Sequence, residues 1–433
     1  MLPECRQREH LFSVPKFEIV SSDVVSFVDE LRCFHDEFSD CFHRSETRDN
    51  VYHYMVGQFS KLERKSIEPI ALAVEDGQVR AIQRAISDTN WDEEKILVKY
   101  HSMVNDDMGD TEGVLMFDES GFVKKGKDSA GVQRQYCGNI GKVENSQVGV
   151  YAAYASRHGY AFLDKRLFIP EEWFSEEHKE RREKCNFPEN LTFATKPQLA
   201  AEMLTEIHNQ GTIPYKYIVA DTIYGHSPDF IETAEKLDGK IYFVSIASDT
   251  KCWLKTPATT SKEYTHKGET HSKIVLRDTT KKPISVQKIA SNLNDYFWYR
   301  RKVSEGTKGP IEYEFSRMRV TLSKDGLPWK IVWLVIRRTI GKNPTYSFFI
   351  SNAPGNIRLP VFVWLCGIRW AIEQCFEEGK TELGMDHYEV RKYPGWNHHM
   401  LTIMLAHFFL WHLKIRLGGE KLHLLHCRSL GYS

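Results

Sequence analysis

The spacing of apolar residues predicts that residues 1–110 are helical. In "SDVVSFVDELRCFHDEFSDCF" (22–42), apolar side chains recur at helical spacing, and Ser22 or Asp23 can cap the first turn. In "GQVRAIQRAISDTNWDEEKILVKYHSMV" (77–104), the same period predicts two more helices with a break at 87–90. The alternation typical of a half-buried strand is not visible in this part of the sequence.

From Gly113 the pattern changes to short apolar runs of the length of buried strands. Examples are "QVGVYAAYAS" (147–156) and "YAFLDKRLFI" (160–169), and helical periods follow near 196–209 and 228–237. The order up to residue 247 is strand, strand, strand, helix, strand, helix, strand. Such an order predicts an α/β layer arrangement.

The last third of the chain predicts a β-rich block followed by helices. Residues 250–350 are rich in Thr, Lys and aromatic residues, with strand-like runs, and helices are expected near 358–382 and 396–416. The most apolar run is "MLTIMLAHFFLWHLKIRL" (400–417), which includes two His and one Lys. Its helical spacing and polar residues favour a buried helix over a membrane span.

The composition is that of a globular protein with room for two or three domains. The 433 residues are 41% apolar and 27% charged, with 58 Lys+Arg against 58 Asp+Glu. A neutral total does not exclude nucleic-acid binding, because binding depends on where charge is concentrated. Nine scattered cysteines without a C-x-x-C pair favour neither a disulfide framework nor a structural zinc site, and they are typical of a reducing cytosol.

Two of the apolar runs end in an aspartate, Asp118 and Asp221. In α/β sheets, ligands bind at the carboxyl ends of strands, so these acids are candidates for a common site. Either acid could instead cap a helix or begin a turn. With a third acid from a later helix, the carboxylates would repel one another unless a hard divalent cation such as Mg²⁺ neutralised them.

The helix expected from about 358 offers Glu373 as that third acid. Helical geometry places Glu373 at the edge of an apolar stripe, in line with Arg369 and Lys380. An ion-pair ladder that only stabilises the helix is the alternative interpretation. The remaining acids of this helix fall off the line and are expected to be solvated: Glu377, Glu378 and Glu382.

These motifs resemble the bacterial insertion-sequence transposases of the DDE class, in the cut-and-paste group whose acidic helix carries Tyr-x-x-Arg, then Glu, then Lys. The matching stretches are "FDESGFVKKGKDSAGVQRQYCGNIGKVENSQVGVY" (117–151), "VADTIYG" (219–225) and "RWAIEQCFEEGKTELGMDHYEVR" (369–391). The resemblance implies that Asp118, Asp221 and Glu373 are catalytic metal ligands. It implies that Arg369 and Lys380 contact DNA. The family's Tyr stands here as Cys366. If that Tyr helps to seat DNA, either Trp364 or Trp370 replaces it here or the protein does without it.

The resemblance also implies an α/β protein with an RNase H-like catalytic core that is interrupted by a β-rich insertion. The expected segments, in chain order, are a helical N-terminal domain (1–110), the first part of the core (111–250), the insertion (251–352), the part of the core with the acidic helix (353–392) and a C-terminal helical segment (393–433). From its position and the family, the N-terminal domain is expected to bind DNA ends. A structural or dimerising role is the alternative, since no clear helix-turn-helix signature is found. The β-rich block found from composition falls where the insertion is expected.

The activity implied is transposition of a DNA element. Mg²⁺, for which Mn²⁺ would substitute, would be bound by the three acids and activate water to cut at the element's ends. The freed 3′-hydroxyl would then attack target DNA. The implied partners are double-stranded DNA, as terminal inverted repeats and target, and a second copy of the chain on that DNA. A cytoplasmic bacterial protein without membrane attachment, associated with the nucleoid when bound, is expected.

Further basic residues lie where they could hold DNA phosphates. They follow Asp118, occupy the turn "EGTKGP", or follow the acidic helix, and they are Lys124, Lys125, Lys127, Arg134, Lys308 and Arg391. A solvated hairpin is the alternative for the first four.

Two other functions are compatible with the same motifs. One is an RNase H-like DNA nuclease that does not join strands, and the other is a non-catalytic DNA-binding protein derived from a transposase. A pre-cut element end offered with target DNA separates the first, because only a transposase joins them. The intact acids weigh against the second.

Overall fold

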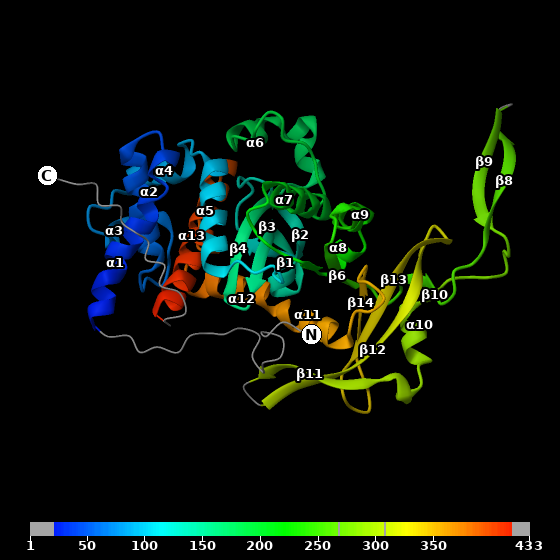
Figure 1. Ribbon diagram of the computed structural model, residues 1–433. Helices are drawn as coiled ribbons and strands as arrows, with labels where there is room; N and C mark the ends of the chain where they lie inside the picture. The colour runs from blue at the N-terminus through cyan, green and yellow to red at the C-terminus, as the bar shows by residue number, and fades with distance from the viewer. Residues whose placement is uncertain (1–20, 267–268, 307–308, 418–433) are drawn as a thin grey trace. The chain divides into compact units, whose positions relative to one another are not determined.

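The computed structural model describes residues 21–266, 269–306 and 309–417 (Figure 1). Contacts divide these residues into two compact units. Unit 1 is the stretch 217–368, and unit 2 combines residues 21–216 with residues 369–417. The proposed division into five sequential segments stays a prediction.

The helical character predicted for residues 1–110 is confirmed from residue 21 on, where the described residues begin. Unit 2 begins with five α-helices, two more than the apolar period indicated. They are α1 (Ser21–Asp36), α2 (Ser45–Gln58), α3 (Ile67–Ala73), α4 (Val79–Ser87) and α5 (Glu93–Met108). The predicted break is confirmed, since α4 ends at Ser87 and α5 begins at Glu93. The Asp92 side chain caps α5 by accepting a hydrogen bond of 3.0 Å from the Lys95 amide.

An antiparallel set of strands forms the centre of unit 2. It consists of β1 (Val114–Val123), β2 (Gln133–Cys137), β3 (Lys142–Ser156) and β4 (Gly159–Phe168). Strand β3 pairs with β1 on one side, while β2 and β4 share its other side end to end. Helices α6 (Lys179–Lys184) and α7 (Lys196–Gln210) come next in the chain, and Thr195 and Gln198 form a capping box on α7.

Helix α13 (Tyr393–Leu417) forms much of the core of unit 2. It packs against β4, α2, α4 and α5, and Figure 1 shows it among these elements. Phe408 contacts Phe34 of α1 and Tyr100 of α5, which places the C-terminal helix inside the N-terminal ones. The prediction of a buried helix is confirmed for this run.

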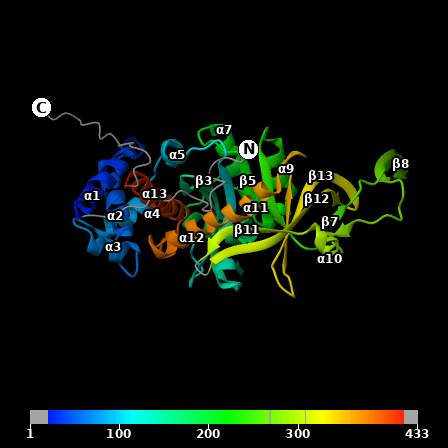
Figure 2. The same ribbon diagram turned by 60° about the horizontal axis from the view of Figure 1, so that its bottom comes forward.

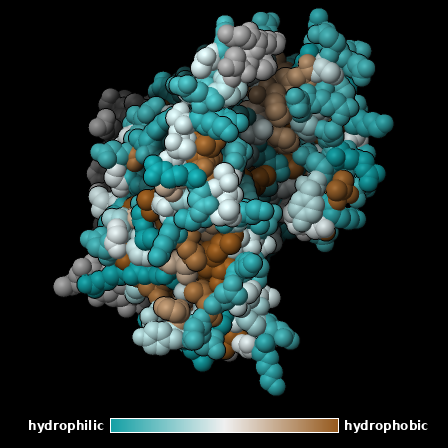
Figure 3. Space-filling model, turned by 90° about the vertical axis from the view of Figure 1, so that its right-hand side faces the viewer, coloured by the Kyte–Doolittle hydropathy of each residue, from teal (hydrophilic) through white to brown (hydrophobic). Residues whose placement is uncertain are grey.

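Two helical stretches, 359–381 and 393–417, are long and apolar enough to cross a membrane by length and composition alone. Most of each is buried inside the protein, as expected of core helices. The face shown in Figure 3 is largely hydrophilic, with apolar side chains gathered in a few hollows. The expectation of no membrane attachment therefore stands as a prediction.

Unit 1 is built on a mixed sheet with the strand order β10-β7-β12-β13-β14-β6-β5, in which β11 also pairs with β12. Strands β5 and β6 are parallel, whereas the other pairs are antiparallel. The strands are β5 (Tyr217–Ala220), β6 (Ile241–Ile246), β7 (Lys251–Trp253), β10 (Ile284–Ser285), β11 (Tyr299–Gly306), β12 (Gly309–Lys324), β13 (Leu327–Arg338) and β14 (Tyr346–Ser351).

The remaining elements of unit 1 are helices and one separate hairpin. The helices are α8 (Thr222–Gly225), α9 (Pro228–Lys236), α10 (Val286–Ser291) and α11 (Leu359–Ile368). The hairpin of β8 (Thr259–His266) and β9 (Glu269–Leu276) pairs only with itself and extends away from the other strands of its unit in both ribbon views (Figures 1 and 2).

The protein is thus a mixed α/β fold with a large mixed sheet, as predicted at the level of fold class. The helix expected near 358–382 is present at 359–381. It is divided at Arg369 into α11 and α12 (Trp370–Thr381), although the Arg369 backbone keeps helical φ and ψ of −54° and −28°. The RNase H-like character of the core and the inserted position of the β-rich block stay predictions.

Candidate active site

Asp118 lies inside a strand and not at its end, which corrects the expectation from the apolar run. The residues before it in β1 are fully buried, and β1 continues to Val123 because its second half pairs with β3. The Asp118 side chain exposes 18% of its surface. One of its oxygens accepts a hydrogen bond of 2.8 Å from the Glu119 amide.

Helix α12 is held against the sheet of unit 2 by aromatic packing beside Asp118. Tyr151 on β3 is the cross-strand partner of Asp118. The Tyr151 ring contacts Phe376 of α12 at a centroid distance of 5.2 Å, and Phe376 also contacts Phe162 of β4 at 5.6 Å. Because Phe376 is three residues after Glu373, this packing fixes the face of α12 that carries the acid.

Arg369 bridges the two acids of unit 2. Its Nη2 donates to Glu373 Oε1 at 2.5 Å, four residues further along the helix, and its Nη1 lies 3.7 Å from Asp118 Oδ2. Glu373 exposes 49% of its side chain and Arg369 exposes 30%. Glu373 is therefore more exposed than its predicted place beside the core implied, while its predicted pairing with Arg369 is present.

The donor set suits a hard divalent cation. Asp118 and Glu373 already share one positive group, so their carboxylates lie on the same small region of unit 2. Carboxylate oxygens are the ligands that Mg²⁺ and Mn²⁺ prefer. Within the described parts of the chain, no group of three His, Cys, Asp or Glu side chains is placed to hold a metal ion.

Asp221, the third predicted acid, belongs to unit 1. It follows β5 directly, so its predicted position at a carboxyl strand end is confirmed. Its carbonyl accepts from the amides of Tyr224 and Gly225 at 3.1 Å each, which turns the chain into α8. Its carboxylate makes no capping bond to the helix and instead accepts a 3.4 Å hydrogen bond from the Thr222 hydroxyl. The capping alternative is therefore not realised.

Two of the predicted DNA-binding lysines of unit 2, Lys380 and Lys124, are packed on aromatic rings. The Lys380 ammonium lies 5.7 Å from the Phe122 ring centroid and 5.9 Å from that of Phe376. Burial lowers the pKa of Lys380, and Asp386 partly offsets this. Lys124 donates to the Tyr388 carbonyl at 2.9 Å and lies 3.2 Å from the Tyr388 ring centroid.

Lys124 differs from the neighbouring cations of the same loop. Burial lowers the pKa of Lys124 to about 7, although Asp386 and Glu389 act in the opposite direction. By contrast, Lys125, Lys127 and Arg134 are exposed. The three exposed cations are accessible to DNA, as their predicted role requires, whereas the Lys124 ammonium is already hydrogen-bonded to the Tyr388 carbonyl.

The other predicted cations have different environments. Arg391 is exposed, and its guanidinium forms a surface ion pair with Asp128 at 3.6 Å. Lys308 lies outside the described residues. Cys366 stands on α11 in unit 1 in the place of the family Tyr. Of the two proposed replacements, Trp370 is 45% exposed, and the Trp364 ring packs on Tyr217 at 5.6 Å.

A family comparison covers this site in part. The profile described as "DDE superfamily endonuclease" matches residues 37–310, more than half of the chain. The chain belongs to the DDE superfamily endonucleases. The matched region includes Asp118 and Asp221 and ends before Glu373. The catalytic role of all three acids stays a prediction for this DDE endonuclease.

A relative supports the resemblance to insertion-sequence transposases. A probable transposase for insertion sequence element IS701 from Microchaete diplosiphon is 24% identical over 378 residues, covering 86% of this chain and 84% of the relative. The predicted resemblance to DDE-class insertion-sequence transposases is thereby confirmed.

Two solved structures also resemble this DDE endonuclease at a low level. One is a piggyBac transposase synaptic complex with hairpin DNA, at a TM-score of 0.40 and 10% identity over 97% of this chain and 78% of that one. The other is the NurA nuclease from Sulfolobus solfataricus, at a TM-score of 0.25 and 10% identity over 64% of this chain and 81% of that one. At such scores neither similarity supports a statement about this chain.

One acid of α12 is not solvated, contrary to the prediction from helical spacing. Glu378, expected to be solvated, exposes only 22% of its side chain. It accepts from the Tyr160 hydroxyl at 2.8 Å and lies 2.9 Å from His407 Nε2. Glu377 is exposed, as predicted.

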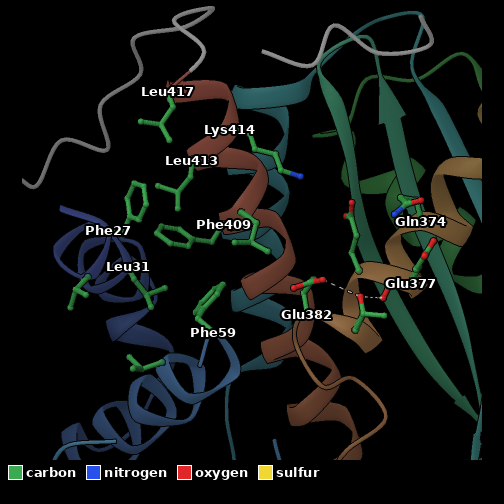
Figure 4. Close-up of a pocket in the computed structure, with 15 residues that line it drawn as sticks. Phe27, Leu31, Phe59, Gln374, Glu377, Glu382, Phe409, Leu413, Lys414 and Leu417 are labelled. Atoms are coloured by element: carbon green, nitrogen blue, oxygen red, sulfur yellow. Dashed lines mark hydrogen bonds between the residues drawn. The ribbon is translucent and has the colours of Figure 1, made fainter. Parts of the chain in front are cut away.

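A groove of about 660 Å³ runs beside the acidic helix in unit 2 (Figure 4). Apolar side chains line one side, including Phe27 of α1, Phe59 directly after α2 and Phe409 of α13, while Gln374 and Glu377 of α12 lie on the other. None of the three predicted acids lines it. The two predicted acids of unit 2, Asp118 and Glu373, therefore lie outside the lining of this apolar groove.

Proposed function

We propose that this protein is a DNA transposase that cuts DNA at the ends of an insertion sequence and joins the freed 3′-hydroxyl to target DNA. Three findings support the proposal: membership of the DDE superfamily endonucleases, the transposase relative, and the acids in their expected order. The observation that carries it is the pair Asp118 and Glu373. Far apart in sequence, they share one cation in unit 2.

The proposed metal ligands are Asp118, Asp221 and Glu373, on an RNase H-like core interrupted by the β-rich insertion. When bound, Mg²⁺ supplies charge stabilisation for the attacking and leaving oxygens of a phosphodiester. In the first reaction, a water oxygen bonds to phosphorus and the bond to the 3′-oxygen breaks, leaving a 3′-hydroxyl and a 5′-phosphate. In the second, that hydroxyl attacks a target phosphodiester, whose own 3′-oxygen leaves and takes up a proton.

The chain's cations would orient the DNA. Guanidinium groups match phosphate geometry, which suits Arg369, and ammonium groups act as point charges, which suits Lys380. The exposed Lys125, Lys127 and Arg134 would add contacts to the DNA backbone, which position the duplex without reading its sequence. Two element ends must be brought together, so a homodimer on terminal inverted repeats and target DNA is proposed, in a cytoplasmic, nucleoid-associated protein.

The test replaces each acid with its isosteric amide. Asp118→Asn, Asp221→Asn and Glu373→Gln should each lower Mg²⁺-dependent cleavage of DNA with the element's ends by more than about 100-fold, because even outer-shell partners of a metal cost 10–100-fold. Glu377→Gln, an exposed acid on the same helix, is the matched control and should keep activity within about twofold. Full activity of Glu373→Gln would exclude that residue as a ligand.

A second assay separates the alternatives. A pre-cut end with a free 3′-hydroxyl is mixed with supercoiled target DNA, and joined products are measured on a gel. Joining supports the transposase. Cleavage without joining indicates a nuclease, and binding without cleavage in any divalent ion indicates a non-catalytic DNA-binding protein.

A further inference from the structure

Arg369 occupies the position of a counter-ion between the two acids of unit 2. It contacts Glu373 at 2.5 Å and lies 3.7 Å from Asp118, so it supplies both acids with a nearby positive charge. Two carboxylates that lie this close would repel each other without a cation. Arginine stays protonated at any accessible pH, so this charge cannot be removed by titration.

The Arg369 guanidinium cannot pair with both acids and bind a DNA phosphate bidentately at the same time. It has a fixed planar fork of donors, and here that fork is directed at Glu373 and Asp118. A divalent ion brings twice the charge of the guanidinium to the same carboxylates. With the ion bound, the local net charge of these three side chains changes from negative to positive, which favours a phosphate.

We propose that Arg369 is an internal counter-ion that holds Asp118 and Glu373 together before metal binding, competes with the divalent ion for both acids, and is released toward DNA phosphate when the ion binds. This inference rests on the proposed function. Metal binding and DNA binding are then coupled through one side chain, and the coupling acts equally in both directions.

The test measures binding of Mn²⁺ alone to the full-length protein, without DNA, by the electron paramagnetic resonance signal of the free ion. Removal of the competitor in Arg369→Gln should tighten Mn²⁺ binding by about fivefold or more, the lower end of typical coupling between two ligands. Arg369→Lys keeps the charge but loses the fork, so it should lie between the wild type and Arg369→Gln.

Lys380→Gln is the matched control. It removes the same charge from the same helix, and the described contacts of the Lys380 ammonium are aromatic rings. Its Mn²⁺ affinity should stay within about twofold of the wild type. A second readout is thermal unfolding without metal. Arg369→Gln should melt below Lys380→Gln in chelator, and Mn²⁺ should raise its midpoint more.

Each outcome decides between the two proposals. If Arg369→Gln binds Mn²⁺ no tighter than Lys380→Gln does, the counter-ion role is wrong. If Asp118→Asn and Glu373→Gln also bind Mn²⁺ like the wild type, the metal site of the proposed function is itself wrong. If these two lose Mn²⁺ while Arg369→Gln gains nothing, only the counter-ion inference fails. Circular dichroism confirms folding, and Arg369→Lys replaces Arg369→Gln in the comparison if the latter is unfolded.

Discussion

Glu378 lies five residues after Glu373 on α12, and its carboxylate has a very different environment. Burial raises the pKa of Glu378, but the hydrogen bonds from His407 and Tyr160 outweigh burial and hold that pKa below its usual value. The carboxylate links α12 to α13 and β4. The orientation of α12, and with it the position of Glu373, therefore depends in part on this buried charge.

Replacement of Glu378 by Gln should destabilise the protein by about 1–3 kcal/mol at pH 7, because a charged hydrogen-bonded group is lost and its partners remain. The folded-state pKa of Glu378 lies below the ordinary 4.5, so its stabilisation is complete above that pH and is lost as pH falls below it. The difference between wild type and variant should therefore shrink on acidification. Urea unfolding at pH 7 and pH 4 measures it.

The exposed Glu377→Gln serves as the control and should change stability by less than about 0.5 kcal/mol at both pH values. A Glu378→Gln difference that stays constant from pH 7 to pH 4 would contradict the linkage.

Side-chain contacts within one helix could be predicted from the sequence, whereas contacts between distant parts of the chain could not. Helical spacing correctly paired Glu373 with Arg369, because both lie on one helix. It assigned Glu378 to solvent, because the partner His407 comes from a helix 29 positions later in the sequence. Local sequence also does not distinguish Lys124 from its exposed neighbours, because Tyr388, which it contacts, lies 264 positions later in the chain.

At the scale of elements, α8 approaches β6 more closely than a side chain allows. A Cβ added to Gly225 would lie 1.9 Å from the Ser245 carbonyl oxygen and 3.3 Å from Val244. The constraint is steric contact with backbone, which cannot move aside easily. Gly225 ends the "VADTIYG" motif, so this contact fixes the turn that begins at Asp221.

Gly225→Ala should therefore destabilise unit 1 by about 1–3 kcal/mol through overpacking. The expected readout is a lower urea midpoint together with reduced cleavage activity, since the turn carrying Asp221 must shift. Gly355→Ala is the control. A Cβ there meets nothing within 4 Å, so its midpoint should match the wild type. An unchanged midpoint for Gly225→Ala would show that α8 can move away from β6.

Element types followed from the sequence more faithfully than element ends. The periods that define α4, α5, α7 and α13 lie within single helices, so they could be found from the sequence alone. The end of β1 could not, because β1 continues past Asp118 only through its pairing with β3.

For the whole molecule, a net charge of zero means that DNA binding must come from local cations. Lys127→Gln, at an exposed position, should weaken DNA binding and lower the slope of log affinity against log salt by about 0.9. Lys124→Gln should leave that slope unchanged, because its ammonium is already bound to the Tyr388 carbonyl. Fluorescence anisotropy of a labelled duplex at several salt concentrations measures both, and equal slopes for the two variants would refute the distinction.

The division into units also has a consequence for the order in which the protein is made. The described part of unit 1 is a single stretch, 217–368, placed between the two parts of unit 2. Helices α2, α4 and α5 leave the ribosome early, but α13, which packs against all three, is made only after the whole of unit 1. Their apolar faces stay uncovered until synthesis of α13 is complete. A chain that stops before residue 393 therefore carries an unfinished core, which makes shortened products poorly stable and readily degraded.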